Sequence, residues 1–197
     1  MACPSPANDS RSARVLLIRH AESRPSRQVL EPDWPLSPAG VVQSQELAGA
    51  LEPLGIAALY SSPYRRAIAT LEPFATLSSM PIGIEPDLRE RKLTDGFHPD
   101  HRSVARKAWE DLAFALPGCE TGLACRRRVR RVVDRLAAKH PGERIALASH
   151  GNAIALYLGS LDGRFGFDEW SAMQNPDVFA VDYATLGSPV RADAFAL

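Results

Sequence analysis

Cysteine is scarce in this chain of 197 residues, and its net charge is zero. The three cysteines, Cys3, Cys119 and Cys125, form no CxxC pair and leave an odd number. This pattern fits neither a disulfide framework nor a zinc cluster, so we expect a reducing compartment. The 23 basic residues balance the 23 acidic ones. Neither nucleic acid nor a membrane surface is therefore expected as the main partner.

Long hydrophobic runs are also missing. No stretch approaches the ~18 apolar residues that span a bilayer, and the first fourteen residues are polar and contain prolines, unlike a signal peptide. A cytoplasmic location is the simplest expectation. The P-loop, GxSxG and HExxH signatures do not occur either, which removes the common motifs of nucleotide binding, serine hydrolysis and zinc proteolysis.

What the sequence does contain is an alternation of strand and helix patterns. Aliphatic runs predict strands, and apolar residues at helical spacing predict the helices between them. The strands are expected at 14–18, 56–60, 81–86, 144–148 and 178–183, and the helices at 38–54, 63–77, 105–114, 121–139 and 151–158. This order predicts an α/β fold, a three-layer sandwich with a largely parallel central sheet.

The length predicts a single domain over residues 1–197, near the upper end of the usual range. Residues 1–13 are expected to form a flexible tail. The irregular segment 94–118, which contains Gly96, Pro99 and two histidines, is expected to form a small cap beside the site.

Two histidines directly follow predicted strands. His20 comes after Arg19 at the end of one strand, and His150 stands between Ser149 and Gly151 at the end of another. Ligands of such folds bind beyond the carboxyl ends of the strands, so both imidazoles could face one crevice. With Arg66 from the helix after the second strand, two imidazoles and two guanidiniums would match a tetrahedral phosphate dianion.

Four motifs in this chain resemble those of the histidine phosphatase superfamily, also called phosphoglycerate-mutase-like. They are the RHG signature in residues 17–23, with alanine in place of glycine at 21, the pattern SSPxxRAxxT in 61–70, LRE in 88–90 and SHGN in 149–152. Ala67 and Thr70 set the register of the second motif. The phosphate-binding arginine is therefore assigned to Arg66 rather than Arg65.

The resemblance implies a phosphatase that transfers a phosphoryl group to His20 and then to water, without metal or cofactor. Arg19, Arg66 and His150 would stabilise charge on the phosphate oxygens. Glu90 would be the proton donor, with Asp87 and Asp95 as alternative acids. Phosphate or substrate binding is also assigned to Ser23, Gly151 and Asn152. The expected substrate is a small phosphate ester.

Three alternatives stay open at this stage. The family's mutases share RHGESxWN, and this chain lacks the Trp and Asn, with Ser26 at the final position. Together with the short cap this favours hydrolysis over a mutase. A binder of phosphorylated ligands without catalysis is a second alternative. A nucleic-acid binder using the arginines of 126–131 is a third, although their alternation with valines favours a solvated helix face.

The predicted cap holds further polar and aromatic residues. His98 and His101, near Asp95 and Asp100, have a spacing that could bring metal ligands together, but we expect them to face solvent or the mouth of the cleft. Six residues are candidates for contacting the leaving group: Phe97, His98, His101, Arg102, Lys107 and Trp109. The motifs select neither the substrate nor an oligomeric state.

Overall fold

A computed structural model places one six-stranded sheet at the centre of the chain, in the order β3-β2-β4-β1-β5-β6. It describes residues 13–163, 165–183 and 189–194. The strands are β1 (Ala13–Arg19), β2 (Ile56–Ser61), β3 (Ile82–Ile84), β4 (Arg144–Ser149), β5 (Asp177–Tyr183) and β6 (Pro189–Ala194). The α-helices are α1 (Pro38–Leu51), α2 (Arg65–Ser78), α3 (His101–Glu110), α4 (Gly122–Lys139), α5 (Gly151–Asp162) and α6 (Phe167–Ala172). Short 3₁₀ turns are η1 (Glu31–Asp33), η2 (Glu52–Leu54) and η3 (Pro86–Leu88).

The sheet is largely parallel, as the sequence predicted. Strand β2 pairs in parallel with β3 and β4, and β4 pairs in parallel with β1. Strand β5 runs antiparallel to β1, and β6 antiparallel to β5. The carboxyl ends of β1, β2 and β4 therefore meet at one edge of the sheet, where the sequence placed the polar loops.

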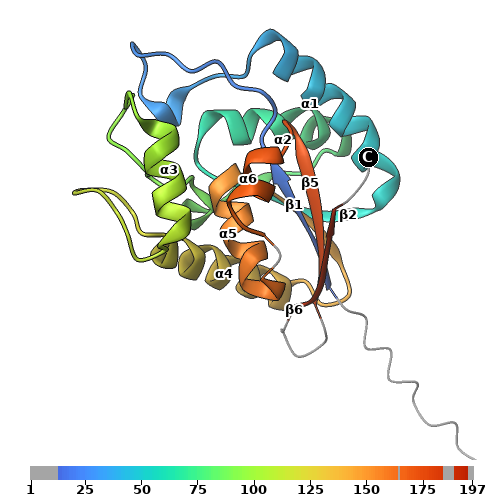
Figure 1. Ribbon diagram of the computed structural model, residues 1–197. Coiled ribbons are helices and arrows are strands. Elements are labelled where there is room, and N and C mark those ends of the chain that lie inside the picture. The colour runs from blue at the N-terminus through green and yellow to red at the C-terminus, as the bar shows by residue number, and fades with distance from the viewer. Residues whose placement is uncertain (1–12, 164, 184–188, 195–197) are drawn as a thin grey trace, which may run out of the picture.

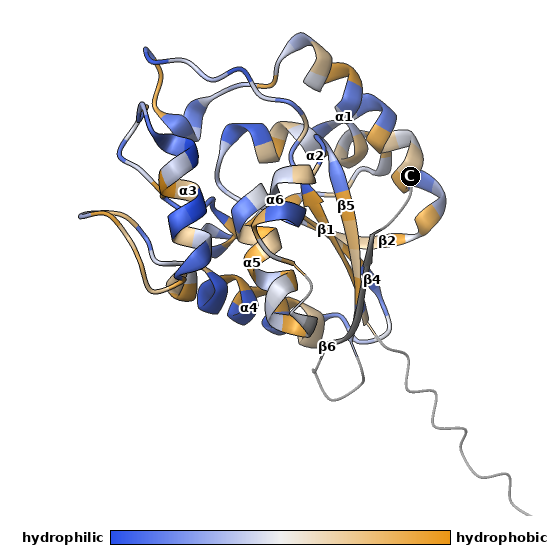
Figure 2. Cartoon of the chain, viewed as in Figure 1, coloured by the Kyte–Doolittle hydropathy of each residue, from blue (hydrophilic) through white to orange (hydrophobic). Residues whose placement is uncertain are grey.

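Helices cover both faces of the sheet, which makes the fold a three-layer sandwich (Figure 1). Alternate residues of β1 point to opposite faces. Val15 and Leu17 pack in one core with α4 and α5, whereas Leu16 and Ile18 pack in the other with α1 and α2. Figure 2 shows the apolar character of the central strand that this double burial requires.

Local capping explains where the helices begin. Ser37 accepts a hydrogen bond from the Gly40 amide at 3.0 Å, as an N-cap side chain should, and Pro38 is the first residue of α1. A Cβ at Gly40 would lie 2.0 Å from the carbonyl oxygen of Glu22. Only glycine therefore lets the loop after β1 lie this close to α1.

Three expectations need correction. The helix predicted at 105–114 spans His101–Glu110 instead, because Ala105 and Ala108 are its buried residues and pack with Leu93. Neither α6 nor β6 was predicted, since both are short and lack a long apolar period. Ala13, assigned to the tail, begins β1, and the rest of that predicted tail lies outside the described residues. No helix within the described residues is long and apolar enough to cross a membrane.

Candidate active site

Two histidines and a serine meet where three neighbouring strands end. His20 follows β1, Ser62 follows β2 and His150 follows β4. The His20 amide donates to the Ser149 carbonyl at 3.1 Å, and the Ser62 amide donates to the Ala148 carbonyl at 2.9 Å. The two imidazole centroids lie 5.2 Å apart in an edge-to-face arrangement. Sheet pairing thus brings together residues that are 130 positions apart in the sequence.

Two hydrogen bonds define the protonation of His20. Its Nδ1 lies 2.7 Å from the Ala21 carbonyl oxygen, which can only accept, so Nδ1 carries the proton. Arg66 Nε donates to His20 Nε2 at 3.1 Å, so Nε2 holds a lone pair. Burial first, and then the charge of Arg66, lower the pKa of His20 to about 3. The imidazole is therefore neutral near pH 7, and its Nε2 can act as a nucleophile once the hydrogen bond from Arg66 Nε gives way.

Arg66 is buried and spans the space between His20 and η1. Its Nη1 donates to the Glu31 carbonyl oxygen at 2.8 Å, and its Nη2 pairs with the Glu31 carboxylate at 2.9 Å. The guanidinium also lies over the rings of Tyr64, at 4.9 Å, and Trp34, at 5.6 Å. The aromatic faces hold the guanidinium by cation–π attraction, and Glu31 occupies both of its terminal nitrogens.

His150 is fully buried beside Tyr64, whose ring centroid lies 4.8 Å away. Ser62 Oγ accepts from the Tyr64 amide at 3.2 Å and lies 2.7 Å from His150 Nε2. Because a hydroxyl has one donor and two acceptor sites, Ser62 Oγ can pair with either tautomer of a neutral His150 imidazole. Burial first, and then Arg66 and His20, hold the pKa of His150 well below its ordinary value.

Arg19 crosses the start of α5. Its Nη1 donates to the Met173 carbonyl at 2.6 Å, while its Nε would lie 3.4 Å from a Cβ built on Gly151. Asn175, in the same segment before β5, donates to the His20 carbonyl at 2.7 Å. Among the described residues, Arg19 Nε and His150 Nδ1 are buried without a hydrogen-bond partner. Arg19 Nε is an N–H donor that a bound anion could satisfy, and so is His150 Nδ1 in the tautomer that carries the proton there.

Glu90 lies at the N-terminal end of α5. Its carboxylate oxygens accept from the amides of Arg91 at 2.8 Å, Ala153 at 3.1 Å and Asn152 at 3.2 Å. These bonds and Arg66 favour the ionised carboxylate, yet burial outweighs them and raises the pKa of Glu90. Glu90 therefore remains protonated to a higher pH than an ordinary glutamate does.

The two alternative acids are engaged elsewhere. Asp87 pairs with Arg89 at 3.2 Å and with Arg131 of α4 at 3.0 Å. The side chain of Asp95 is 87% exposed and pairs with Lys92 at 2.8 Å, a hydrogen bond that lowers its pKa. Neither arrangement suits a general acid, which needs a raised pKa and a place beside the reacting group.

The structure places the remaining predicted binding residues in different surroundings. Ser23 is half-buried and its backbone forms a bridge with Leu36. Asn152 Oδ1 accepts from Trp109 Nε1 at 3.1 Å, so this side chain is tied to α3. Phe97 stacks on Trp34 at 5.6 Å. Of the other leaving-group candidates, His98 accepts from the Asp100 amide at 3.1 Å, Lys107 lies 4.3 Å from the ring of Phe114, and His101 and Arg102 are exposed.

Several residues around the site were not expected. Glu31, Trp34 and Tyr64 carried no assigned role, and only the family pattern at 61–70 pointed to the position of Ser62. The expectation of a solvated face over 126–131 is wrong at Arg128, which is 4% exposed. Its side chain turns inward toward the segment that carries Glu90. The described residues contain no group of three or more His, Cys, Asp or Glu side chains that could hold a metal ion.

Comparison with known proteins gives relatives over most of the chain. The chain is 27% identical over 187 residues to the adenosylcobalamin/alpha-ribazole phosphatase of Escherichia coli, which covers 85% of this chain and 92% of that protein. The native structure of a mycobacterial glucosyl-3-phosphoglycerate phosphatase is 25% identical, with a TM-score of 0.75, and the match covers 92% of this chain and 97% of that one.

The same fold occurs in a phosphoglycerate mutase from Bacillus anthracis, with a TM-score of 0.74 and 18% identity over 95% of this chain and 94% of that one. A family model for the histidine phosphatase superfamily (branch 1) matches residues 15–186. The match contains every one of the site residues described above. This chain therefore belongs to branch 1 of the histidine phosphatase superfamily.

Proposed function

We propose that this protein hydrolyses small phosphate monoesters through a phosphohistidine on His20. The observation that carries the proposal is the state of His20: a neutral imidazole whose Nε2 lone pair lies 3.1 Å from the Arg66 guanidinium. An imidazole in this state can attack phosphorus, and the neighbouring cation stabilises the charge that the phosphoryl group brings.

Charge on the equatorial oxygens would be met by Arg19, Arg66 and His150. Arg19 Nε, which has no hydrogen-bond partner in the part of the chain that the structure describes, can donate to such an oxygen without breaking an existing bond, as can His150 Nδ1 in the tautomer that carries the proton there. Gly151 and the backbone at the start of α5 line the same region, where a helix N-terminus favours an anion. Positioning and electrostatics supply most of the catalysis in such a site.

Glu90 would protonate the leaving oxygen and then, as a carboxylate, accept a proton from the attacking water. Its raised pKa keeps it in the acid form for the first step. The engagement of Asp87 and Asp95 in ion pairs supports this assignment over both alternatives.

Hydrolysis is favoured over mutase chemistry by the lack of the Trp and Asn of the mutase motif, with Ser26 at the last position. The names of two relatives, an alpha-ribazole phosphatase and a glucosyl-3-phosphoglycerate phosphatase, describe enzymes that act on small phosphorylated molecules. We extend that substrate class, though no individual substrate, to this chain. We also treat 1–197 as one domain with 94–118 as its cap, supported by the Trp109 to Asn152 hydrogen bond.

The proposed charges come from side chains alone, so chelation should not affect the reaction. Phosphate release from para-nitrophenyl phosphate should be equal before and after dialysis against EDTA. An assay of turnover with and without added Mg²⁺, Mn²⁺ or Zn²⁺ checks this. Loss of activity on chelation, restored by one of these ions, would overturn the metal-free mechanism.

The Glu31 carboxylate should compete with phosphate for Arg66, because it pairs with Nη2 of that guanidinium at 2.9 Å. In a Glu31→Gln variant the affinity for inorganic phosphate should rise about two- to fivefold. This range corresponds to the loss of about 0.5–1 kcal/mol from a half-exposed ion pair. Product inhibition or calorimetry measures this affinity. Asp33→Asn, an exposed acid two residues away, is the matched control, and unchanged or weaker binding by Glu31→Gln would contradict the expectation.

A further inference from the structure

Arg128 is a buried cation that the reaction itself does not use. It lies in the middle of α4, among the apolar residues Cys125, Val129 and Val132, and is 4% exposed. Burying a guanidinium costs free energy unless every donor finds a partner. A simple structural helix would be better served by an aliphatic residue at this position, so the contacts of Arg128 need an explanation.

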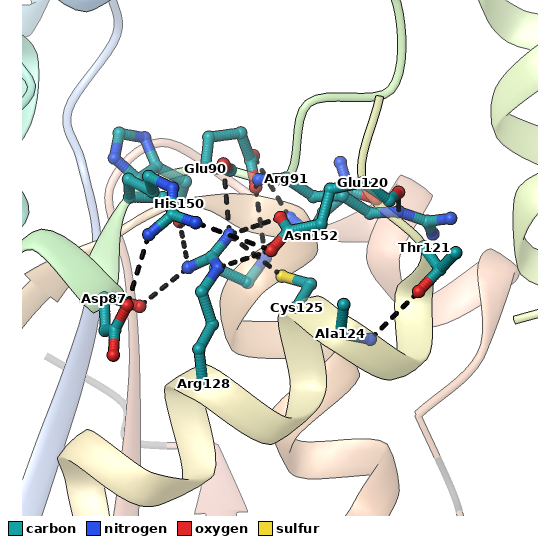
Figure 3. A network of polar contacts seen from close by, with 12 residues as sticks. Asp87, Glu90, Arg91, Glu120, Thr121, Ala124, Cys125, Arg128, His150 and Asn152 are labelled. Atoms are coloured by element: carbon teal, nitrogen blue, oxygen red, sulfur yellow. Dashed lines mark hydrogen bonds and ion pairs between the residues drawn. The ribbon is translucent and has the colours of Figure 1, made fainter. Parts of the chain in front are cut away.

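All three nitrogens of the guanidinium are engaged, and its two edges face different partners (Figure 3). One edge forms a bidentate pair with the Glu120 carboxylate, with Nε to Oε1 and Nη2 to Oε2 both at 2.7 Å. The other edge donates to backbone carbonyl oxygens. Nη1 reaches Asp87 at 2.7 Å and Arg89 at 2.8 Å, and Nη2 reaches Glu90 at 3.2 Å.

The Asp87 carbonyl lies in η3, and those of Arg89 and Glu90 belong to the turn that carries Glu90. The turn follows η3 and has no regular secondary structure of its own, so side chains must satisfy its backbone. Ser149 Oγ donates to the Leu88 carbonyl at 2.7 Å, and Arg128 holds the carbonyls on either side. The backbone of 87–90 is thus held against both β4 and α4.

The Glu90 carboxyl is held from the opposite side by the amides of Asn152 and Ala153. Glu90 therefore lies between two anchors: Arg128 fixes its main chain and α5 fixes its carboxyl. Lysine could not replace Arg128, because a point charge with three donors cannot form a bidentate pair and reach three carbonyls at once. Glu120 neutralises the buried guanidinium and directs its free edge toward the turn.

We propose that Arg128, oriented by Glu120, is a positioning residue that holds the main chain of 87–90 so that the Glu90 carboxyl meets the leaving oxygen of the substrate. The inference rests on the proposed function, in which Glu90 is the proton donor. Arg128 touches neither the substrate site nor His20. Its main effect on the reaction passes through the placement of Glu90, although its charge also helps to lower the pKa of His150, a contribution that a lysine at 128 would keep.

The test compares two substrates whose leaving groups differ in their need for an acid. In Arg128→Met, turnover of a simple alkyl phosphate should fall about 10- to 100-fold, the scale of a misplacement near 1 Å. Formation of nitrophenolate in the first turnover of para-nitrophenyl phosphate should change by less than about threefold, because that leaving group departs without protonation. Arg127→Met, an exposed neighbour on α4, is the matched control and should leave both rates unchanged.

A double variant separates positioning from general damage. If Arg128 acts only through Glu90, then adding Arg128→Met to Glu90→Gln should lower the alkyl phosphate rate by less than about twofold further. Arg128→Lys keeps the buried charge and should show the same substrate contrast. The lysine variant decides the question if the methionine variant does not fold, as judged by circular dichroism.

Two failures can be told apart. If Glu90→Gln itself shows no contrast between the substrates, the assignment of the proton donor fails and the role of Arg128 fails with it. If Glu90→Gln shows the contrast while folded Arg128 variants lose both substrates equally, or lose neither, only the role of Arg128 is refuted.

Discussion

Replacing His20 by alanine should abolish turnover while the fold remains intact. The variant lacks the side chain that forms the phosphorus–nitrogen bond, and the other proposed groups stabilise charge or transfer protons without bonding to phosphorus. Loss of a nucleophile of this kind costs on the order of 10⁴-fold or more. The measurement is phosphate release from para-nitrophenyl phosphate, with circular dichroism to verify folding.

His140→Ala is the control for this experiment. His140 follows the last residue of α4 and contacts Tyr60 and Glu143 at 2.8 and 2.6 Å. It precedes the start of β4, whereas the site loop follows the end of that strand. Its loss should leave turnover within about twofold, as expected for a position away from the reacting atoms. A folded and pure His20→Ala protein that keeps more than a trace of activity would rule out His20 as the nucleophile.

The Glu90→Gln variant should separate the two chemical steps. Para-nitrophenolate leaves without a proton, so phosphoryl transfer to His20 should survive for para-nitrophenyl phosphate. Transfer from an alkyl phosphate should fall by about 10²–10⁴-fold, because an alkoxide needs the acid. Hydrolysis of the phosphohistidine should slow for both substrates, because the base is missing.

The expected signature is a burst of nitrophenolate close to about one equivalent per site, followed by slow turnover, with phosphate trapped on His20. Rapid-quench kinetics and phosphohistidine detection measure it. Glu46→Gln, an exposed glutamate on α1, serves as the control. If Glu90→Gln loses both substrates in the same proportion, another acid protonates the leaving group.

The pH dependence supplies an independent readout of the same residue. Glu90 donates only while it is protonated, so the wild-type rate on an alkyl phosphate should fall as pH rises through the Glu90 pKa. Since burial raises that pKa, the fall should begin above the range of an ordinary glutamate. The Gln variant should lack this alkaline limb, because glutamine does not titrate.

The local sequence was sufficient to predict strands β1 to β5 and most of the residues that the structure brings together at the candidate site. Strands such as β1 and β4 are short aliphatic runs, as expected for strands that are buried on both faces. Such a run can be recognised from the local sequence alone. His20 and His150 follow strands directly, and Arg66 lies in the first turn of the helix after β2, so their meeting at one edge follows from the parallel order. The family motifs fixed the register of Arg66 and pointed to Glu90.

Contacts between distant segments decided the rest. The proton on His20 Nδ1 and the lone pair on Nε2 depend on Ala21 and Arg66 together, and the pairing of Arg66 with Glu31 depends on how the loop before α1 folds back. Asp87, Glu90 and Asp95 are chemically similar acids in the sequence. The LRE motif points to Glu90, but only the fold shows that burial beside α5 raises its pKa, whereas the pKa values of Asp87 and Asp95 are lowered.

Arg128 illustrates why some features of the site could be predicted from the sequence and others could not. Five arginines occur between 126 and 131. Helical periodicity does not show which of those near the apolar stripe is buried. The inward turn of Arg128 is decided by Glu120 and by three carbonyls about forty residues earlier in the chain. A sequence pattern records which residues are apolar, but the burial of a charge depends on partners that only the folded chain brings within hydrogen-bond distance.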